Sequence, residues 1–176
     1  MQPDDRAKRP LTILAGGYGH PVHPALVPVP IGAWVASLVF DVASHLVPDP
    51  AFLAQGSRWL IGLGVLGALA AATIGFLDLL SIPGRTPAFR TAVVHMSLAL
   101  AATTAFAIGF VVRDDPVAPV PAGPLALSVV ALLALGGAGY LGGELAYRYG
   151  VRVADERAQA AGFRRTAHTD PSKEKI

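Results

Sequence analysis

Four long apolar segments, separated by short polar breaks, dominate the hydrophobic pattern of the chain. A helix needs roughly 20 apolar residues to cross the hydrocarbon core of a bilayer, with a range of about 17–25. None of the segments alternates with period two, so they do not indicate the strands of a membrane barrel. We therefore predict an all-α integral membrane four-helix bundle, polytopic, with the N and C termini on the same side. The predicted spans are about 30–47, 59–80, 91–112 and 124–147.

Prolines and charges mark the breaks between the segments. Pro48 and Pro50 end the first helix, because proline lacks an N–H and disfavours helix in the residue before it. Ser57 is a candidate N-cap for the second helix. Three regions follow: a polar N-terminal segment over 1–16, the transmembrane domain over 17–150, and a basic, partly disordered tail over 151–176.

Small residues are predicted to bring the helices close together. Gly64, Ala68 and Ala72 recur at four-residue steps in the second segment, and Gly139 and Gly143 do so in the fourth. Because lipid gives no hydrophobic drive for helix association, close packing over small residues matters in a membrane. We expect helix–helix contacts at these faces.

Composition supports the membrane class and excludes several others. The chain is 53% hydrophobic and 15% charged, against about 25% charged residues in an average soluble domain. It has no cysteine, which excludes disulfides, cysteine-held iron–sulfur clusters and c-type haem attachment. The net charge is only +2, and no basic run with interleaved aromatics occurs, so no nucleic-acid partner is indicated.

The distribution of Lys and Arg predicts the orientation. With four spans, the side of the termini would hold twelve basic residues and the other side two, so by the positive-inside rule both termini should be cytoplasmic. The twelve are Arg6, Lys8, Arg9, Arg85, Arg90, Arg148, Arg152, Arg157, Arg164, Arg165, Lys173 and Lys175, and the two are Arg58 and Arg113.

Ionisable residues in or near the spans are the candidates for chemistry, because charged groups inside a bilayer are costly and often functional. The predicted topology brings one set of five to a single level near the cytoplasmic face: His20, His23, Asp78, His95 and Glu144. Asp41 and His45 lie in the opposite half, and their i, i+4 spacing predicts a pair on one helix.

Local alternatives exist for most of this set. The two histidines before the first helix each precede a proline, which predicts a stiff extended strap up to Pro30. These rings could instead satisfy backbone groups or lie among lipid headgroups. Asp78 could cap a helix end or pair with Arg85 or Arg90, and Glu144 could pair with Arg148 at i+4. His95 has no charged neighbour in the sequence, which makes it the hardest to explain structurally.

Several of these motifs resemble an uncharacterised family of bacterial membrane proteins, the transmembrane domain of unknown function 2231. They are His20-Pro21-Val22-His23-Pro24, Pro30-Ile31-Gly32, Asp41, Asp78, His95, the stretch Gly139–Leu145 and the stretch Tyr147–Val151. The likeness runs from about residue 20 to 151 and implies a bacterial inner (plasma) membrane location. Some members join this module to Rieske or c-type cytochrome domains, which implies redox-protein or membrane-complex partners; no such domain occurs here.

Three functions remain open. The first is a b-type haem-binding or redox-associated subunit, with His20, His23 and His95 as candidate ligands. The second is a divalent transition-metal or proton-relay site, in which Asp78 and Glu144 join the three histidines. The third is a structural or assembly module without chemistry. An enzyme is disfavoured, because no nucleophile elbow, phosphate loop or metalloprotease motif occurs.

Overall fold

The computed structural model describes residues 7–9, 12, 16, 20–115 and 117–163. Four helical segments, the first of them α2 and α3 together, are long and apolar enough to cross a membrane, which confirms the predicted fold class. The helices are α2 (Val22–Leu26), α3 (Pro28–Ala43), α4 (Ala51–Ser81), α5 (Pro87–Val112), α6 (Ala122–Tyr147) and α7 (Glu156–Gly162).

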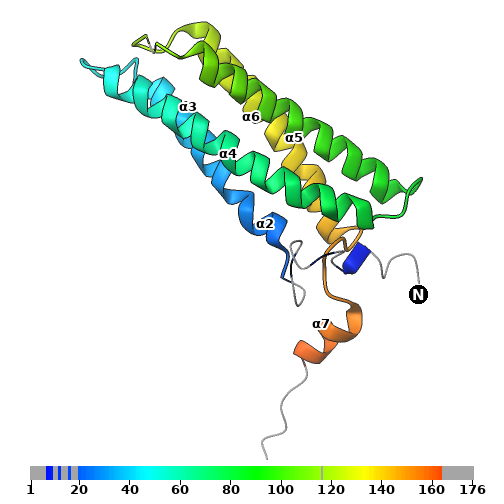
Figure 1. The fold of residues 1–176 in the computed structure, drawn as a ribbon. Helices are drawn as coiled ribbons and strands as arrows, with labels where there is room; N and C mark the ends of the chain where they lie inside the picture. Colours follow the sequence, from blue (N-terminus) through cyan, green and yellow to red (C-terminus); the bar gives the residue numbers. More distant parts are fainter. Residues whose placement is uncertain (1–6, 10–11, 13–15, 17–19, 116, 164–176) are drawn as a thin grey trace, which may run out of the picture.

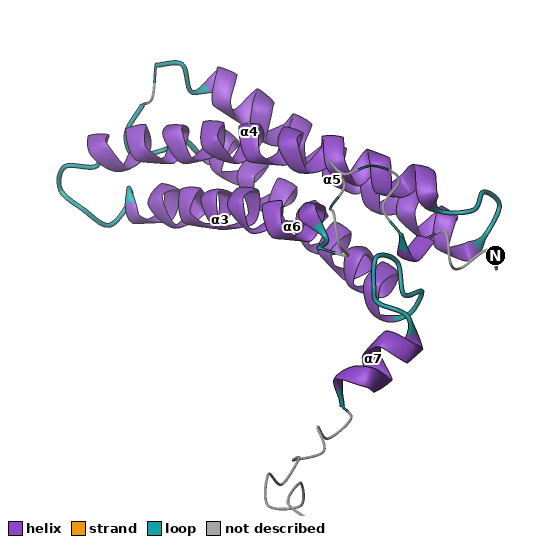
Figure 2. Ribbon diagram, turned by 60° about the horizontal axis from the view of Figure 1, so that its bottom comes forward, coloured by secondary structure: helices purple, strands orange, loops and turns teal. Residues whose placement is uncertain are grey.

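Consecutive long helices pack side by side in alternating directions, and α6 returns to contact α3 (Figure 1). The bundle thus has two ends. We call the end with the α3–α4 and α5–α6 connections the loop end. The other, with the α4–α5 connection, is the terminal end, because the segments around Ala7 and Arg152 meet there through a backbone hydrogen bond of 3.0 Å. Helix α7 lies beyond this end (Figure 2).

The first span begins earlier than the sequence suggested. The expected extended strap is helical from Val22, and α2 continues almost directly into α3, where the amide of Ile31 lies 3.4 Å from the carbonyl of Val27. Proline is tolerated in a first helical turn, where the missing N–H would have no partner anyway. Pro24 and Pro28 occupy such positions, so His23 sits on a helix.

The connections between helices also differ in detail from expectation. Helix α4 begins at Ala51, so Ser57 lies inside the helix and is fully buried instead of capping it. Helix α5 is capped by Thr86, whose hydroxyl accepts a hydrogen bond from the amide of Phe89 at 3.1 Å. Pro87 follows as the first helical residue, which is a favourable position for it.

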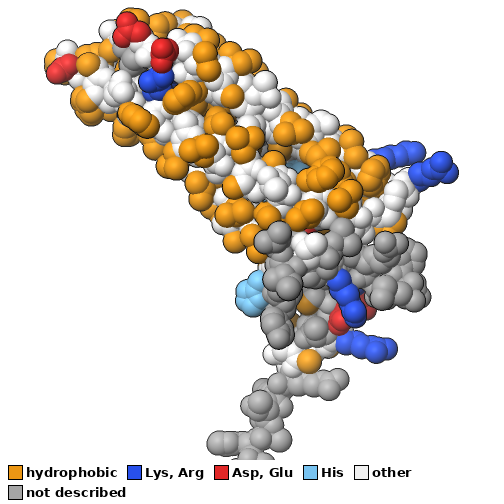
Figure 3. Space-filling model, in the orientation of Figure 1, with side chains coloured by type: hydrophobic (Ala, Val, Ile, Leu, Met, Phe, Trp, Pro, Cys, Tyr) orange, Lys and Arg blue, Asp and Glu red, His pale blue; other side chains and the backbone are white. Residues whose placement is uncertain are grey.

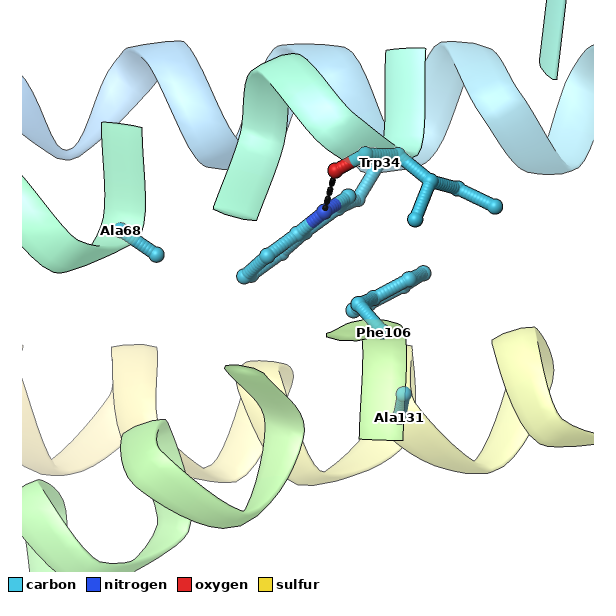
Figure 4. Close-up of a cluster of buried hydrophobic side chains, with 5 residues drawn as sticks. Trp34, Ala68, Phe106 and Ala131 are labelled. Carbon is cyan, nitrogen blue, oxygen red and sulfur yellow. Dashed lines mark hydrogen bonds between the residues drawn. The ribbon is translucent and has the colours of Figure 1, made fainter. Parts of the chain in front are cut away.

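The centre of the bundle is a close-packed apolar layer. The rings of Trp34 and Phe106 stack with centres 4.3 Å apart and planes 10° apart. Ile61, Ala68 and Ala131 complete this buried cluster. The Trp34 Nε1–H donates to the carbonyl of Ile61 at 3.2 Å (Figure 4), which satisfies the only polar atom of the indole ring.

Large apolar side chains cover the long sides of the bundle, and charged side chains gather at its two ends (Figure 3). Leu66, Val111 and Leu133 are among the exposed ones, each more than 65% accessible. An apolar surface of this extent is costly in water and suits contact with lipid.

Candidate functional site

His23 and His95 face each other near the terminal end. His23 comes from α2 and His95 from the third turn of α5, and their ring centres lie 6.3 Å apart with the planes at 87°. Both rings are partly buried. The structure therefore brings together two of the three predicted histidines, from segments 72 residues apart.

Each of the two rings is held by a backbone carbonyl. His23 Nδ1 lies 2.8 Å from the Ala71 oxygen, and His95 Nδ1 lies 2.7 Å from the Ala138 oxygen. A carbonyl oxygen can only accept, so both Nδ1 atoms carry the proton. The neutral rings then keep the lone pair on Nε2, which is the tautomer of a metal-binding histidine whose other nitrogen is oriented by a hydrogen bond.

Two glycines make room for the rings. A Cβ atom added at Gly75 would lie 3.0 Å from His23 Cε1, and one at Gly142 would lie 3.2 Å from His95 Cε1. Such contacts would force the rings to shift. The glycine-rich end of α6 thus lets His95 lie directly against the helix backbone.

Asp78 lies at the same end, but its partner is not the expected one. Its Oδ1 is 3.1 Å from Arg152 Nε, and both side chains are largely buried. The sequence suggested Arg85 or Arg90 instead. The difference arises because the segment after α6 folds back over the bundle end, with Arg152 in a left-handed conformation at φ 59°. Asp78 also interacts electrostatically with His23.

The remaining candidates lie outside this pair. Glu144 forms an i, i+4 ion pair with Arg148 at 2.6 Å, which confirms the local alternative and raises the pKa of the Arg148 guanidinium through the hydrogen bond. His20 is exposed ahead of α2. Within the described part of the chain, no group of three or more His, Cys, Asp and Glu residues could hold a metal ion. The five predicted ligands therefore do not form one ligand set there.

A second polar centre at the loop end was missed. Asp41 and Arg113 form a two-pronged ion pair, with Nη1–Oδ1 at 2.7 Å and Nη2–Oδ2 at 2.8 Å. Asp41 is fully buried and Arg113 is 4% exposed. The Arg113 guanidinium also donates to the Ser57 hydroxyl at 2.9 Å, the Pro124 carbonyl at 3.0 Å and the Ser128 hydroxyl at 3.1 Å. All four spans meet at this centre.

The predicted pairing of Asp41 with His45 is wrong. His45 Nε2–H donates instead to the carbonyl of Val120 at 3.0 Å, while the amide of Val120 donates to Ser44 Oγ at 3.0 Å. The i, i+4 rule considers only neighbours on one helix, whereas a buried carboxylate takes the strongest available partner. The sequence did carry a signal for this pair. One span ends at a lone Arg, and another contains an Asp in the same half of the bundle. Because an unpaired charge inside a membrane is costly, two such residues are expected to pair.

Comparison with known families agrees with the fold. The model of a family described as a predicted membrane protein, the domain of unknown function 2231, matches residues 19–155. The chain belongs to this family. The resemblance noted in the sequence is thereby confirmed, and the match includes both facing histidines and all four long helices of this 2231-family membrane protein. No curated protein sequence and no solved structure shows a significant match.

Proposed function

We propose that His23 and His95 would hold a b-type haem, in a membrane subunit that transfers electrons. The observation that carries this proposal is the pair of facing imidazoles, each with Nδ1 held by a carbonyl and Nε2 left with its lone pair. A haem iron bound by two histidines needs rings that are oriented through Nδ1 and keep the lone pair on Nε2.

The separation of the rings supports the same reading. Two imidazole nitrogens, each about 2.0–2.1 Å from a shared metal, would place the ring centres roughly 6 Å apart once the size of the rings is added. The structure has 6.3 Å. Helix α2 packs on α4 and α3 and has no extensive contact with α5 or α6.

The small number of protein ligands favours haem over a bare ion. A metal ion that takes its ligands from protein side chains needs three or four of them, and no such group is found among the residues that the structure describes. In haem the porphyrin supplies the equatorial nitrogens, so two histidines suffice. Gly75 and Gly142 provide the close approach that the two rings need.

The bound haem would supply reversible one-electron transfer. The protein's own part is to fix the ring tautomers, to place an acidic side chain, Asp78, beside His23, and to surround the centre with apolar helices. From the basic residues at the terminal end we propose that this end faces the cytoplasm of a bacterium, with the protein in the plasma membrane and a redox protein or complex subunit as partner.

The test is to express the protein with haem supplementation and to purify it in detergent. We expect a reduced-minus-oxidised difference spectrum of a six-coordinate b-type haem. His23→Ala and His95→Ala should each abolish it, while His20→Ala and His45→Ala, which change exposed rings outside the pair, should retain it. Because the planes are at 87°, the ferric EPR signal should be the highly anisotropic low-spin type of perpendicular imidazoles.

Two results would contradict the haem proposal. One is wild-type protein without haem but with stoichiometric bound metal, which would favour the metal-site alternative. The other is folded wild-type and His23→Ala proteins that both lack haem and metal, which would favour a structural module.

Neighbouring glycines offer a matched pair for the same assay. Gly142→Ala should reduce haem retention at least several-fold, because the added methyl group would meet His95 Cε1 at 3.2 Å. Gly143→Ala should retain haem, because its Cβ would have nothing within 4 Å. The ratio of haem absorbance to protein measures the effect. Equal haem content in the two variants would show that the ring position is not set by this contact.

A further inference from the structure

The polar side chains of the bundle interior lie in two separate layers. His23, Asp78 and His95 are at the terminal end, and Asp41 with Arg113 is at the loop end. His23 and Asp41 are 18 residues apart on the first span (41 minus 23). At a helical rise of about 1.5 Å per residue, this corresponds to roughly 27 Å along the bundle.

An apolar layer separates the two. Trp34 and Phe106 stack across the middle of the bundle and are each 1% exposed. Two hydroxyls near this layer bond to their own helices: Ser37 to the Trp34 carbonyl at 2.8 Å and Thr103 to the Ala99 carbonyl at 2.8 Å. Their hydrogens are therefore donated within their own helices and not to a group of either polar layer. Passage of an ion or a hydrophilic reagent through this layer carries a large desolvation cost.

The loop end is closed by its own charges. Five donor–acceptor contacts hold the Arg113 guanidinium to oxygens of α3, α4 and α6. The α5–α6 connection is fastened to the end of α3 through Val120, which bonds to Ser44 and His45. A small depression lined by Arg113, Val120 and Pro124 lies at this end, but the buried ion pair stands between it and the apolar layer.

At the terminal end the buried charges lie on the same side of the apolar layer as the two histidines. Asp78 interacts electrostatically with His23 and pairs with Arg152, which belongs to the segment that meets Ala7 outside the helices. Asp78 Oδ1 is buried and makes an ion pair, but it accepts no hydrogen bond from the described residues. It therefore has an acceptor position for a water molecule arriving from this side.

We infer that the His23–His95 centre is accessible to, and exchanges electrons with, one aqueous phase only, the one at the terminal end. The part about electrons rests on the proposed haem. The part about aqueous access rests on the packing of the bundle alone. The protein then exchanges electrons with a water-soluble electron donor or acceptor at that face. It does not conduct electrons across the bilayer.

The chain has no cysteine, so single-cysteine accessibility can test the inference without haem. Thr91 and Ala99 lie one turn on either side of His95 on the same face of α5. In oriented vesicles treated with a membrane-impermeant maleimide, Thr91→Cys should react only from the side that labels Gly84→Cys in the α4–α5 connection. Ala99→Cys and Ser37→Cys should react at least tenfold more slowly from either side. Val117→Cys, on the α5–α6 connection, reports the opposite side.

Labelling of Ala99→Cys or Ser37→Cys from the Val117 side would overturn the inference. A second measurement uses haem-loaded protein and dithionite, an impermeant reductant, added to one side at a time. Fast reduction from the Gly84 side and at least tenfold slower reduction from the Val117 side is expected, and equal rates would overturn it. A protein without haem would instead refute the proposed function, while the labelling pattern would still decide the question of access.

Discussion

Replacing Arg113 by methionine should lower the free energy of unfolding by about 3–5 kcal/mol, the cost of breaking a buried ion pair at one partner. Asp41 is fully buried, so the substitution leaves its carboxylate without a counter-charge in the bundle interior. Ser57 and Ser128 would remain as hydrogen-bond donors, but neutral hydroxyls do not replace the charge. Reversible unfolding in mixed detergent micelles measures the effect.

Two further variants show whether the loss of stability comes from the unpaired charge or from the change in side-chain volume. The double variant Asp41→Leu/Arg113→Met should recover most of the lost stability, because apolar residues of similar volume often replace a buried ion pair at little cost. Asp114→Asn removes a carboxylate that is 87% exposed and paired with Arg58, and should cost no more than about 1 kcal/mol. If Arg113→Met unfolded like Asp114→Asn, the buried pair would not hold the loop end together.

This centre also shows what the sequence could not reveal. The apolar segments predict four spans because each helix must satisfy its backbone hydrogen bonds internally and present apolar side chains to lipid. Such constraints are local. The contact between Asp41 and Arg113 joins residues 72 positions apart, and its choice over His45 depends on how the helices pack. Ser57 likewise suggested a helix cap by its type, whereas its burial assigns it to the same ion pair.

The histidine pair was predictable in part. The topology placed His23 and His95 at one level of the bundle, because α2 and α5 both begin at the terminal end. Their separation from Glu144 was not predictable, because the Glu144 carboxylate forms an ion pair with the nearest guanidinium on its own helix, that of Arg148. The helical state of the segment around His23 was also missed, since prolines there were interpreted as helix breakers although they fall in first turns.

A second large effect is expected at Gly64, in the apolar layer that separates the two polar centres. Gly64→Ala should destabilise the protein by about 1–3 kcal/mol, because the added methyl group overpacks the core. An ideal Cβ there would lie 2.2 Å from Trp34 Nε1 and 2.5 Å from Trp34 Cδ1. The indole cannot move aside easily, because it stacks on Phe106 and donates to the Ile61 carbonyl. This clash outweighs the gain in helix propensity of about 0.5–1 kcal/mol.

The matched control is Gly136→Ala on α6, where an added Cβ has nothing within 4 Å. It should leave the free energy of unfolding unchanged or raise it by up to about 1 kcal/mol through helix propensity. The double variant Gly64→Ala/Trp34→Phe should be more stable than the sum of its single variants predicts, because Phe lacks the nitrogen nearest to the new methyl group. Additive effects in this cycle would mean that the indole does not set the approach of α3 to α4. The apolar layer, and with it the one-sided access of the histidine pair, would then depend on other contacts.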